Sequence, residues 1–72
     1  MKAKIKRIEN LTKYEGSYFV YFDYINQEKK TIITPKVLKY LGVDKLEVGD
    51  TINIVKSIKN NKISYLITNI EK

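Results

Sequence analysis

The chain has 72 residues, no cysteine and no histidine, and its formal net charge is +6 because 14 Lys and Arg face eight Asp and Glu. Without Cys or His it can form no disulfide, no zinc site built on those ligands and no catalytic mechanism that uses their side chains. The length allows one small domain, residues 1–72, which buries only about 60% of the surface of its unfolded chain.

Residues 2–8, KAKIKRI, alternate between apolar and basic side chains, which predicts a β-strand. Ile5 belongs to the apolar face of this strand. The opposite face carries Lys2, Lys4 and Lys6. Ile8 breaks the alternation, so we expect a β-bulge near Lys6 and Arg7 that restores it and bends the strand.

The segment 17–26, SYFVYFDYIN, is the second predicted strand and concentrates the aromatic residues of the chain. An unpaired carboxylate is costly in an apolar core, so Asp23 assigns its own face to solvent. Phe22 lies on the other face and is expected in the core. By the same alternation, Phe19 and Tyr21 are expected as exposed rings on the outer face.

A polar turn, NQEKK, leads to a third predicted strand at residues 30–34, whose inward face is ambiguous because two isoleucines are adjacent. A helix of about two turns is expected next. Thr34 can cap it, Pro35 suits its first position, and Gly42 suits the left-handed residue that ends a helix. The apolar stripe of this helix consists of Val37, Leu38 and Leu41.

The last part of the chain predicts a β-hairpin. LEVGD, residues 46–50, forms a tight entry into a fourth strand at residues 51–58. KNNK, residues 59–62, suits a hairpin turn because asparagine tolerates positive φ. The fifth predicted strand, residues 62–70, has apolar side chains on both faces. That pattern indicates a strand buried on both sides or one wrapped around the closure of a sheet.

Five strands with a short helix between the third and fourth is the order of the OB-fold, a partly open barrel. The expected fold is therefore mainly β, a small five-stranded OB-like barrel. The segment KLEVGDTINIVKSIKNNKISYLITNIEK resembles the last two strands of OB-fold proteins such as cold-shock and bacterial initiation-factor domains. The aromatic RNA-binding motifs of cold-shock domains are not present as such. The resemblance implies nucleic-acid binding on the outer face of the early strands.

A second segment, TIITPKVLKYLGVDKLEVGDTINIV, is similar to AbrB-type swapped-hairpin DNA-binding domains. Three dipeptides match that pattern in order: Pro35-Lys36, Leu41-Gly42 and Gly49-Asp50. The spacing departs from it, one residue short in the helix and several residues long before the last dipeptide, and the first two strands have no counterpart. This resemblance implies a homodimeric DNA-binding regulator with the tyrosine-rich strand in a dimer core.

The charge indicates a nucleic-acid partner, since the sequence pI is about 9.6 and a pI above about 9 is typical of nucleic-acid-binding domains. The same lysine-rich, Ile-, Asn- and Tyr-rich composition is also what an AT-rich coding sequence produces without selection for binding. Lysines would neutralise phosphates and exposed rings would stack on bases, which favours single-stranded DNA or RNA, although duplex DNA also suits the lysine excess. The candidate nucleic-acid-binding residues are Lys4, Lys6, Lys13, Tyr14, Phe19, Tyr21, Lys30, Lys59 and Lys62.

The sequence contains no Gly-rich phosphate loop, no metal-binding cluster and no nucleophile paired with a base, so we expect no enzymatic activity and no cofactor. The N-terminal pattern is not that of a signal peptide and no apolar run could span a bilayer, so a soluble cytoplasmic protein is expected. A third interpretation remains open: the exposed rings could dock a partner protein, or a second copy of the chain in a homodimer.

Overall fold

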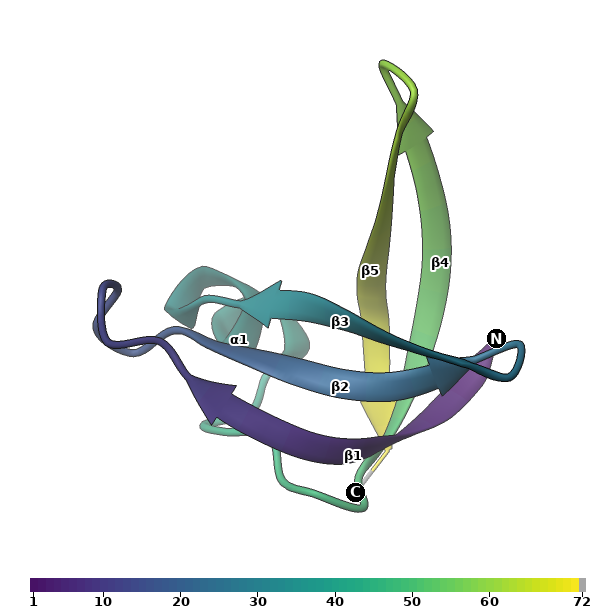
Figure 1. Ribbon diagram of the computed structural model, residues 1–72. Coiled ribbons are helices and arrows are strands. Elements are labelled where there is room, and N and C mark those ends of the chain that lie inside the picture. The colour runs from purple at the N-terminus through teal and green to yellow at the C-terminus, as the bar shows by residue number, and fades with distance from the viewer. Residues whose placement is uncertain (72) are drawn as a thin grey trace.

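The computed structural model describes residues 1–71 and contains five strands and one short helix. In chain order these are β1 (Lys2–Asn10), β2 (Tyr18–Tyr24), β3 (Gln27–Ile33), α1 (Pro35–Leu41), β4 (Thr51–Lys59) and β5 (Lys62–Glu71). All the paired strands are antiparallel, in the order β3-β2-β1-β4-β5. Figure 1 shows β1, β2 and β3 as one curved layer, from which the β4–β5 hairpin rises. The predicted mainly-β class, with the helix between the third and fourth strands, is confirmed.

The core forms on the face of β2 that the sequence assigned to it. Phe22 and Val20 are fully buried, whereas Asp23 is exposed on the opposite face. The rest of the cluster consists of Leu46, from the loop before β4, and isoleucines from four other strands: Ile5, Ile33, Ile52, Ile54 and Ile67. The expected bulge in β1 is also present, because the pairing of β1 with β2 shifts register between Ile5 and Arg7. The bulge lets Ile8 pack against the same core as Ile5.

The turn between β2 and β3 lies earlier than the sequence predicted. Ile25 and Asn26 have φ of 49° and 63°, and β3 already begins at Gln27 rather than at residue 30. Two successive residues of positive φ match the right-handed twist of a hairpin. A β-branched residue rarely adopts positive φ, so the sequence pattern placed Ile25 in the strand. The two adjacent isoleucines of β3 divide between the faces, with Ile33 buried and Ile32 exposed.

Helix α1 begins and ends as its sequence signals predicted. The Thr34 hydroxyl accepts a hydrogen bond from the Val37 amide at 3.3 Å, and Pro35 occupies the first turn. Gly42 ends the helix with φ of 74°. The apolar stripe packs against the core, which is how a seven-residue helix remains stable. Within residues 1–71, no helix is long and apolar enough to cross a membrane.

The β4–β5 hairpin turns at Asn60 and Asn61, both with positive φ, as expected. Its outer half differs from the prediction, because β5 is not buried on both sides. Four apolar side chains of the hairpin are exposed: Val55, Ile58, Ile63 and Leu66. The reason is that the sheet is not closed, and β3 and β5 are its two edges. A hydrogen bond of 2.7 Å from the Thr31 hydroxyl to the Tyr65 carbonyl links these edges in the described chain.

Candidate nucleic-acid interface

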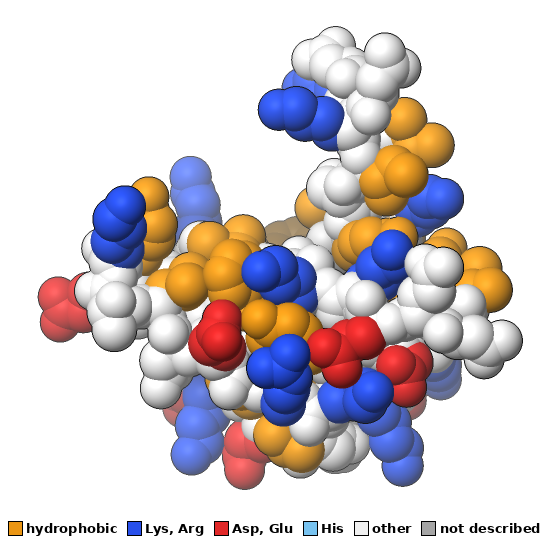
Figure 2. Space-filling model, viewed as in Figure 1, with side chains coloured by type: hydrophobic (Ala, Val, Ile, Leu, Met, Phe, Trp, Pro, Cys, Tyr) orange, Lys and Arg blue, Asp and Glu red, His pale blue; other side chains and the backbone are white. Residues whose placement is uncertain are grey.

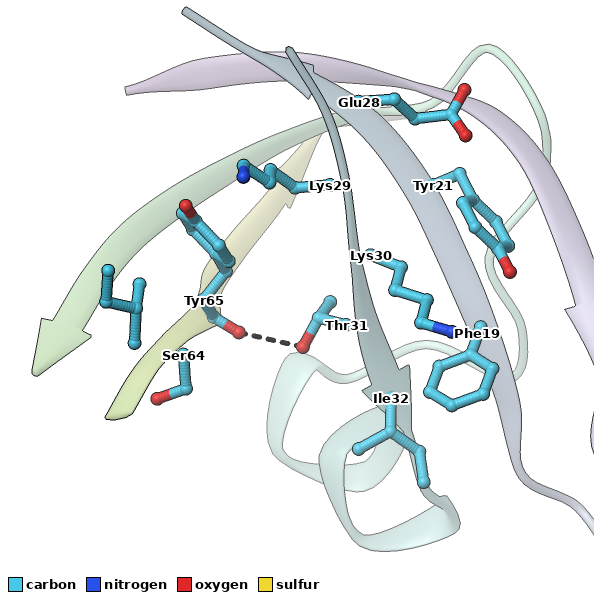
Figure 3. Close-up of a pocket in the computed structure, with 10 residues that line it drawn as sticks. Phe19, Tyr21, Glu28, Lys29, Lys30, Thr31, Ile32, Ser64 and Tyr65 are labelled. Atoms are coloured by element: carbon cyan, nitrogen blue, oxygen red, sulfur yellow. Dashed lines mark hydrogen bonds between the residues drawn. The ribbon is translucent and has the colours of Figure 1, made fainter. Parts of the chain in front are cut away.

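A groove of about 550 Å³ lies where the hairpin leaves the curved layer. We call it the β3–β5 groove. Residues 28–32 of β3 line it centrally, Phe19 and Tyr21 of β2 line one side, and residues 63–65 of β5 line the other. Figure 3 shows the side chains of the two sides on opposite flanks of β3. The groove exists because two sheet edges approach each other without pairing.

Two smaller hollows adjoin this groove, and Tyr65 lines all three. One, of about 260 Å³, lies between β3, α1 and β5, and the other, of about 300 Å³, lies between the β2–β3 turn and the hairpin. The Tyr65 ring is partly exposed and packs on Phe22 and Tyr24, with centroids 5.8 and 5.1 Å apart. Sequence reasoning did not list Tyr65 as a candidate. The sequence did contain a signal for it: Tyr65 lies two residues before the apolar Ile67 in the predicted fifth strand, and therefore on the same face.

The charges around the groove are unevenly distributed. Residues 29–43 and 51–70, which supply most of its lining, contain no Asp or Glu. They carry seven lysines: Lys29, Lys30, Lys36, Lys39, Lys56, Lys59 and Lys62. Among residues 1–71 none of these lysines forms a salt bridge. In Figure 2 the visible surface of the hairpin bears lysine and apolar side chains, while the acidic side chains gather over the curved layer.

The outer face of the curved layer is, by contrast, compensated by ion pairs. Lys6 contacts Asp23 at 3.2 Å and Glu28 at 3.4 Å, and Arg7 contacts Glu28 at 3.2 Å. The carboxylates raise the pKa of Lys6, chiefly through Asp23, and the pKa of Arg7, chiefly through Glu28. The hydrogen bond from Arg7, with that from Lys6, lowers the pKa of Glu28. The candidate Lys6 therefore already has two anionic partners.

The two rings predicted to be exposed are on the expected face but are covered. Tyr21 is only 9% exposed, because the Arg7 guanidinium lies 3.7 Å from its ring centroid. Its hydroxyl donates to Glu9 at 3.2 Å. Phe19 is half-buried, with the Lys30 ammonium 4.4 Å from its centroid. Alternation along a strand gives the direction of a side chain, but not which long side chains from neighbouring strands fold over it. The prediction of an exposed Tyr21 is therefore wrong.

The remaining candidates do not form one site. Lys13 and Tyr14 lie in the β1–β2 loop, at the opposite end of the curved layer from the β2–β3 turn (Figure 1). Lys4 lies on β1 where it pairs with β4. Lys59 and Lys62 form the last cross-strand pair before the hairpin turn. The structure therefore brings Phe19, Tyr21 and Lys30 together in the groove, places the two hairpin lysines beyond it, and separates the others.

The groove combines ammonium groups with aromatic rings, the two kinds of side chain that bind phosphates and planar groups. Within residues 1–71, no three His, Cys, Asp or Glu side chains are grouped so as to hold a metal ion. In comparisons with known proteins, the chain matches no family model, no curated protein and no solved structure significantly.

Proposed function

We propose that the chain is a non-enzymatic nucleic-acid-binding module that holds a single strand of DNA or RNA along the β3–β5 groove. The observation that carries the proposal is the charge distribution: residues 29–43 and 51–70, which supply most of the lining of the groove and its adjoining hollows, carry seven lysines and no carboxylate. Glu28, which also lines the groove, is already paired with Lys6 and Arg7. Lysine binds phosphate as a point charge and reads no base edge in particular. Binding is therefore expected to depend little on sequence.

The groove is a better phosphate site than the outer face of β1. A lysine without an anionic partner can release counterions from a bound strand, whereas a lysine that already contacts carboxylates must first lose those contacts. Lys6 has two such contacts and Lys2 has one, with Glu71 at 2.7 Å. Lys56 and Lys29 line the same hollow beside Tyr65 without a salt bridge in the described chain. The proposed path of the backbone therefore runs past Lys29 and Lys56.

Tyr65 favours single strands over duplexes. Its ring is partly exposed where the groove and both smaller hollows meet, and its other contacts hold it in place. A base that stacks on an aromatic side chain gains about 1–3 kcal/mol, and only an unpaired base presents its face. The exposed Ile63, on the same face of the hairpin, adds apolar surface beside the ring.

We further propose that the fold is a partly open OB-like barrel. The strand order, the helix between β3 and β4 and the approach of β3 to β5 support this assignment. The Thr31–Tyr65 hydrogen bond links the two edge strands, and both residues also line the groove. The resemblance of the last two strands to OB-fold proteins agrees with this arrangement.

The test is a fluorescence-anisotropy titration of the protein with labelled single-stranded oligothymidine, oligouridine and a duplex of equal length, at several salt concentrations. The logarithm of the association constant should fall linearly with the logarithm of salt, by about 0.7 per neutralised phosphate for a single strand. Lys29→Gln and Lys56→Gln should each reduce this slope by roughly the contribution of one contact. Lys45→Gln, outside both acid-free segments, is the matched control. No binding at low salt, or binding that ignores salt, would contradict the proposal.

The hairpin supports a second candidate function, docking of a protein partner. Val55 and Leu66 form an exposed cross-strand apolar pair on the face away from Tyr65. Partner binding through this pair should survive Lys29→Gln and Lys56→Gln and be lost in Leu66→Ser. An AbrB-like dimer is a weaker alternative, because Phe22 of the tyrosine-rich strand is already fully buried in a single chain. Analytical ultracentrifugation distinguishes it, since that alternative requires an obligate dimer.

A further inference from the structure

Two neighbouring rings on the outer face of β2 each carry a cation over one face. The Arg7 guanidinium lies 3.7 Å from the centroid of Tyr21, and the Lys30 ammonium lies 4.4 Å from the centroid of Phe19. Figure 3 shows the Lys30 side chain extending along β3 so that its nitrogen ends beside Phe19. Both rings line the β3–β5 groove. The two covers look alike but are held very differently.

The cover on Tyr21 is anchored. Arg7 forms a salt bridge with Glu28 at 3.2 Å, and Glu28 also contacts Lys6 at 3.4 Å. The Tyr21 hydroxyl is itself bonded to Glu9. An incoming phosphate would have to displace a carboxylate before it could draw the guanidinium away. Tyr21 therefore stays covered when an anion enters the groove.

The cover on Phe19 has no such anchor. Among residues 1–71, Lys30 forms no salt bridge, and its side chain is exposed. Its ammonium is also 6.0 Å from the centroid of Tyr21, at the outer limit of a cation–π contact, so that ring adds little attraction. An exposed cation–π contact is weaker than the stacking of a base on the same ring. A phosphate near Lys30 can therefore draw the ammonium off Phe19 at little cost.

We infer that Lys30 is a lid on Phe19, opened by a phosphate of the bound strand so that the adjacent unpaired base stacks on the exposed ring. The inference rests on the proposed function and names the ligand more closely: a chain that carries phosphates and free bases together. A polyanion without bases opens the lid but gains no stack. A duplex supplies phosphates but keeps its bases paired. Phe19 and Lys30 thus act as one unit that selects single-stranded nucleic acid among polyanions.

The direct test is NMR of the wild-type protein, which needs no substitution. In the free protein the side-chain protons of Lys30 next to its ammonium should be shifted upfield by the ring current of Phe19. Addition of an abasic deoxyribose-phosphate strand should return them toward ordinary lysine positions. Addition of oligothymidine should do the same and also give contacts between the Phe19 ring and thymine protons. Lys30 protons that do not move when either strand binds would overturn the inference while leaving the proposed function intact.

A double-mutant cycle tests the coupling between the two residues. Phe19→Leu should weaken binding of oligothymidine by roughly tenfold or more, as expected for one lost stack, and leave binding of the abasic strand unchanged. Val48→Ala, at an exposed apolar side chain in the loop before β4 and away from the groove, is the control and should change neither. Lys30→Met keeps an aliphatic side chain over Phe19 but has no charge that a phosphate could draw away. The loss of oligothymidine affinity caused by Phe19→Leu should therefore be smaller in the Lys30→Met background than in the wild type. If the affinity losses from Phe19→Leu and Lys30→Met simply add in the double variant, the inference is overturned. If no strand binds the protein at all, the inference and the proposed function fall together.

Discussion

The guanidinium of Arg7 lies 3.7 Å from the centre of the Tyr21 ring, directly across the ladder that joins β1 to β2. The same guanidinium reaches Glu28 of β3 at 3.2 Å. One side chain thus covers a ring on the central strand of this layer and pairs with a carboxylate on its edge strand. This link explains why the Tyr21 ring on the outer face of the layer is covered, and it makes Glu28 the residue whose titration reports on that cover.

We expect Glu28→Gln to lower the melting temperature by a few degrees at neutral pH, because Arg7 and Lys6 lose their shared partner. Those partners lower the pKa of Glu28 in the folded state. A carboxyl with a lowered folded pKa stabilises the protein above its unfolded pKa, and this contribution is lost as the pH falls through the folded value. The gap in melting temperature between wild type and variant should be constant above about pH 4.5, the ordinary value for Glu, and narrow below it.

Thermal melts followed by circular dichroism between neutral and acidic pH measure this gap. Glu15→Gln, in the β1–β2 loop, is the control and should leave the melting temperature close to that of the wild type, since the structure gives Glu15 no salt bridge among residues 1–71. If the difference in melting temperature between the wild type and Glu28→Gln stays constant through the acidic range, the charge of the carboxylate does not affect stability.

The hairpin allows one substitution to be compared at a buried and an exposed position of the same strand. Ile54 is 2% exposed and Ile58 is 67% exposed, both on β4. We expect Ile54→Val to lower the free energy of unfolding by about 0.5–1.5 kcal/mol, through lost burial and a small cavity. Ile58→Val should change it by less than about 0.5 kcal/mol. Urea denaturation measures both, and equal losses would mean that the outer half of the hairpin is packed in solution.

A partly buried hydrogen bond gives the third comparison. The Leu46 amide donates to the Tyr18 hydroxyl at 3.0 Å, and Leu46 is 4% exposed. Tyr18→Phe removes the acceptor and leaves that amide without it, which should cost about 1–3 kcal/mol of the free energy of unfolding. Tyr40→Phe removes a hydroxyl from a ring that is 75% exposed and serves as the control. Hydrogen exchange at the Leu46 amide should be faster in Tyr18→Phe than in the wild type, because the amide has lost its acceptor. Unchanged or slower exchange would contradict the assigned hydrogen bond.

Local signals in the sequence predicted most of the elements because each depends on one or two residues. Asp23 oriented the faces of β2, since a carboxylate cannot enter an apolar core unpaired. Thr34 and Gly42 set the limits of α1. The turn at Ile25 was missed because the backbone twist of the hairpin outweighs the preference of a β-branched residue for negative φ.

The candidate site was harder to predict, because it depends on which segments meet. The sequence identified the lysine excess and pointed to Phe19 and Lys30, which the register of β2 and β3 brings close. It gave no sign that Lys2 and Lys6 of β1 are paired with acids from β2, β3 and β5. Nor did it identify Tyr65, whose position depends on how far the hairpin stands from the β3 edge.

The sequence by itself determined the order of strands and helix along the chain, the faces of β2, the caps of the helix and the positive charge. These follow from period, turn chemistry and residue counts, all of which act within a few positions along the chain. Only the tertiary structure decided where the charge is free to act and which rings are covered. Salt bridges and ring contacts act through space over a few ångströms, so they depend on residues that lie far apart in the chain and meet only when the sheet has formed.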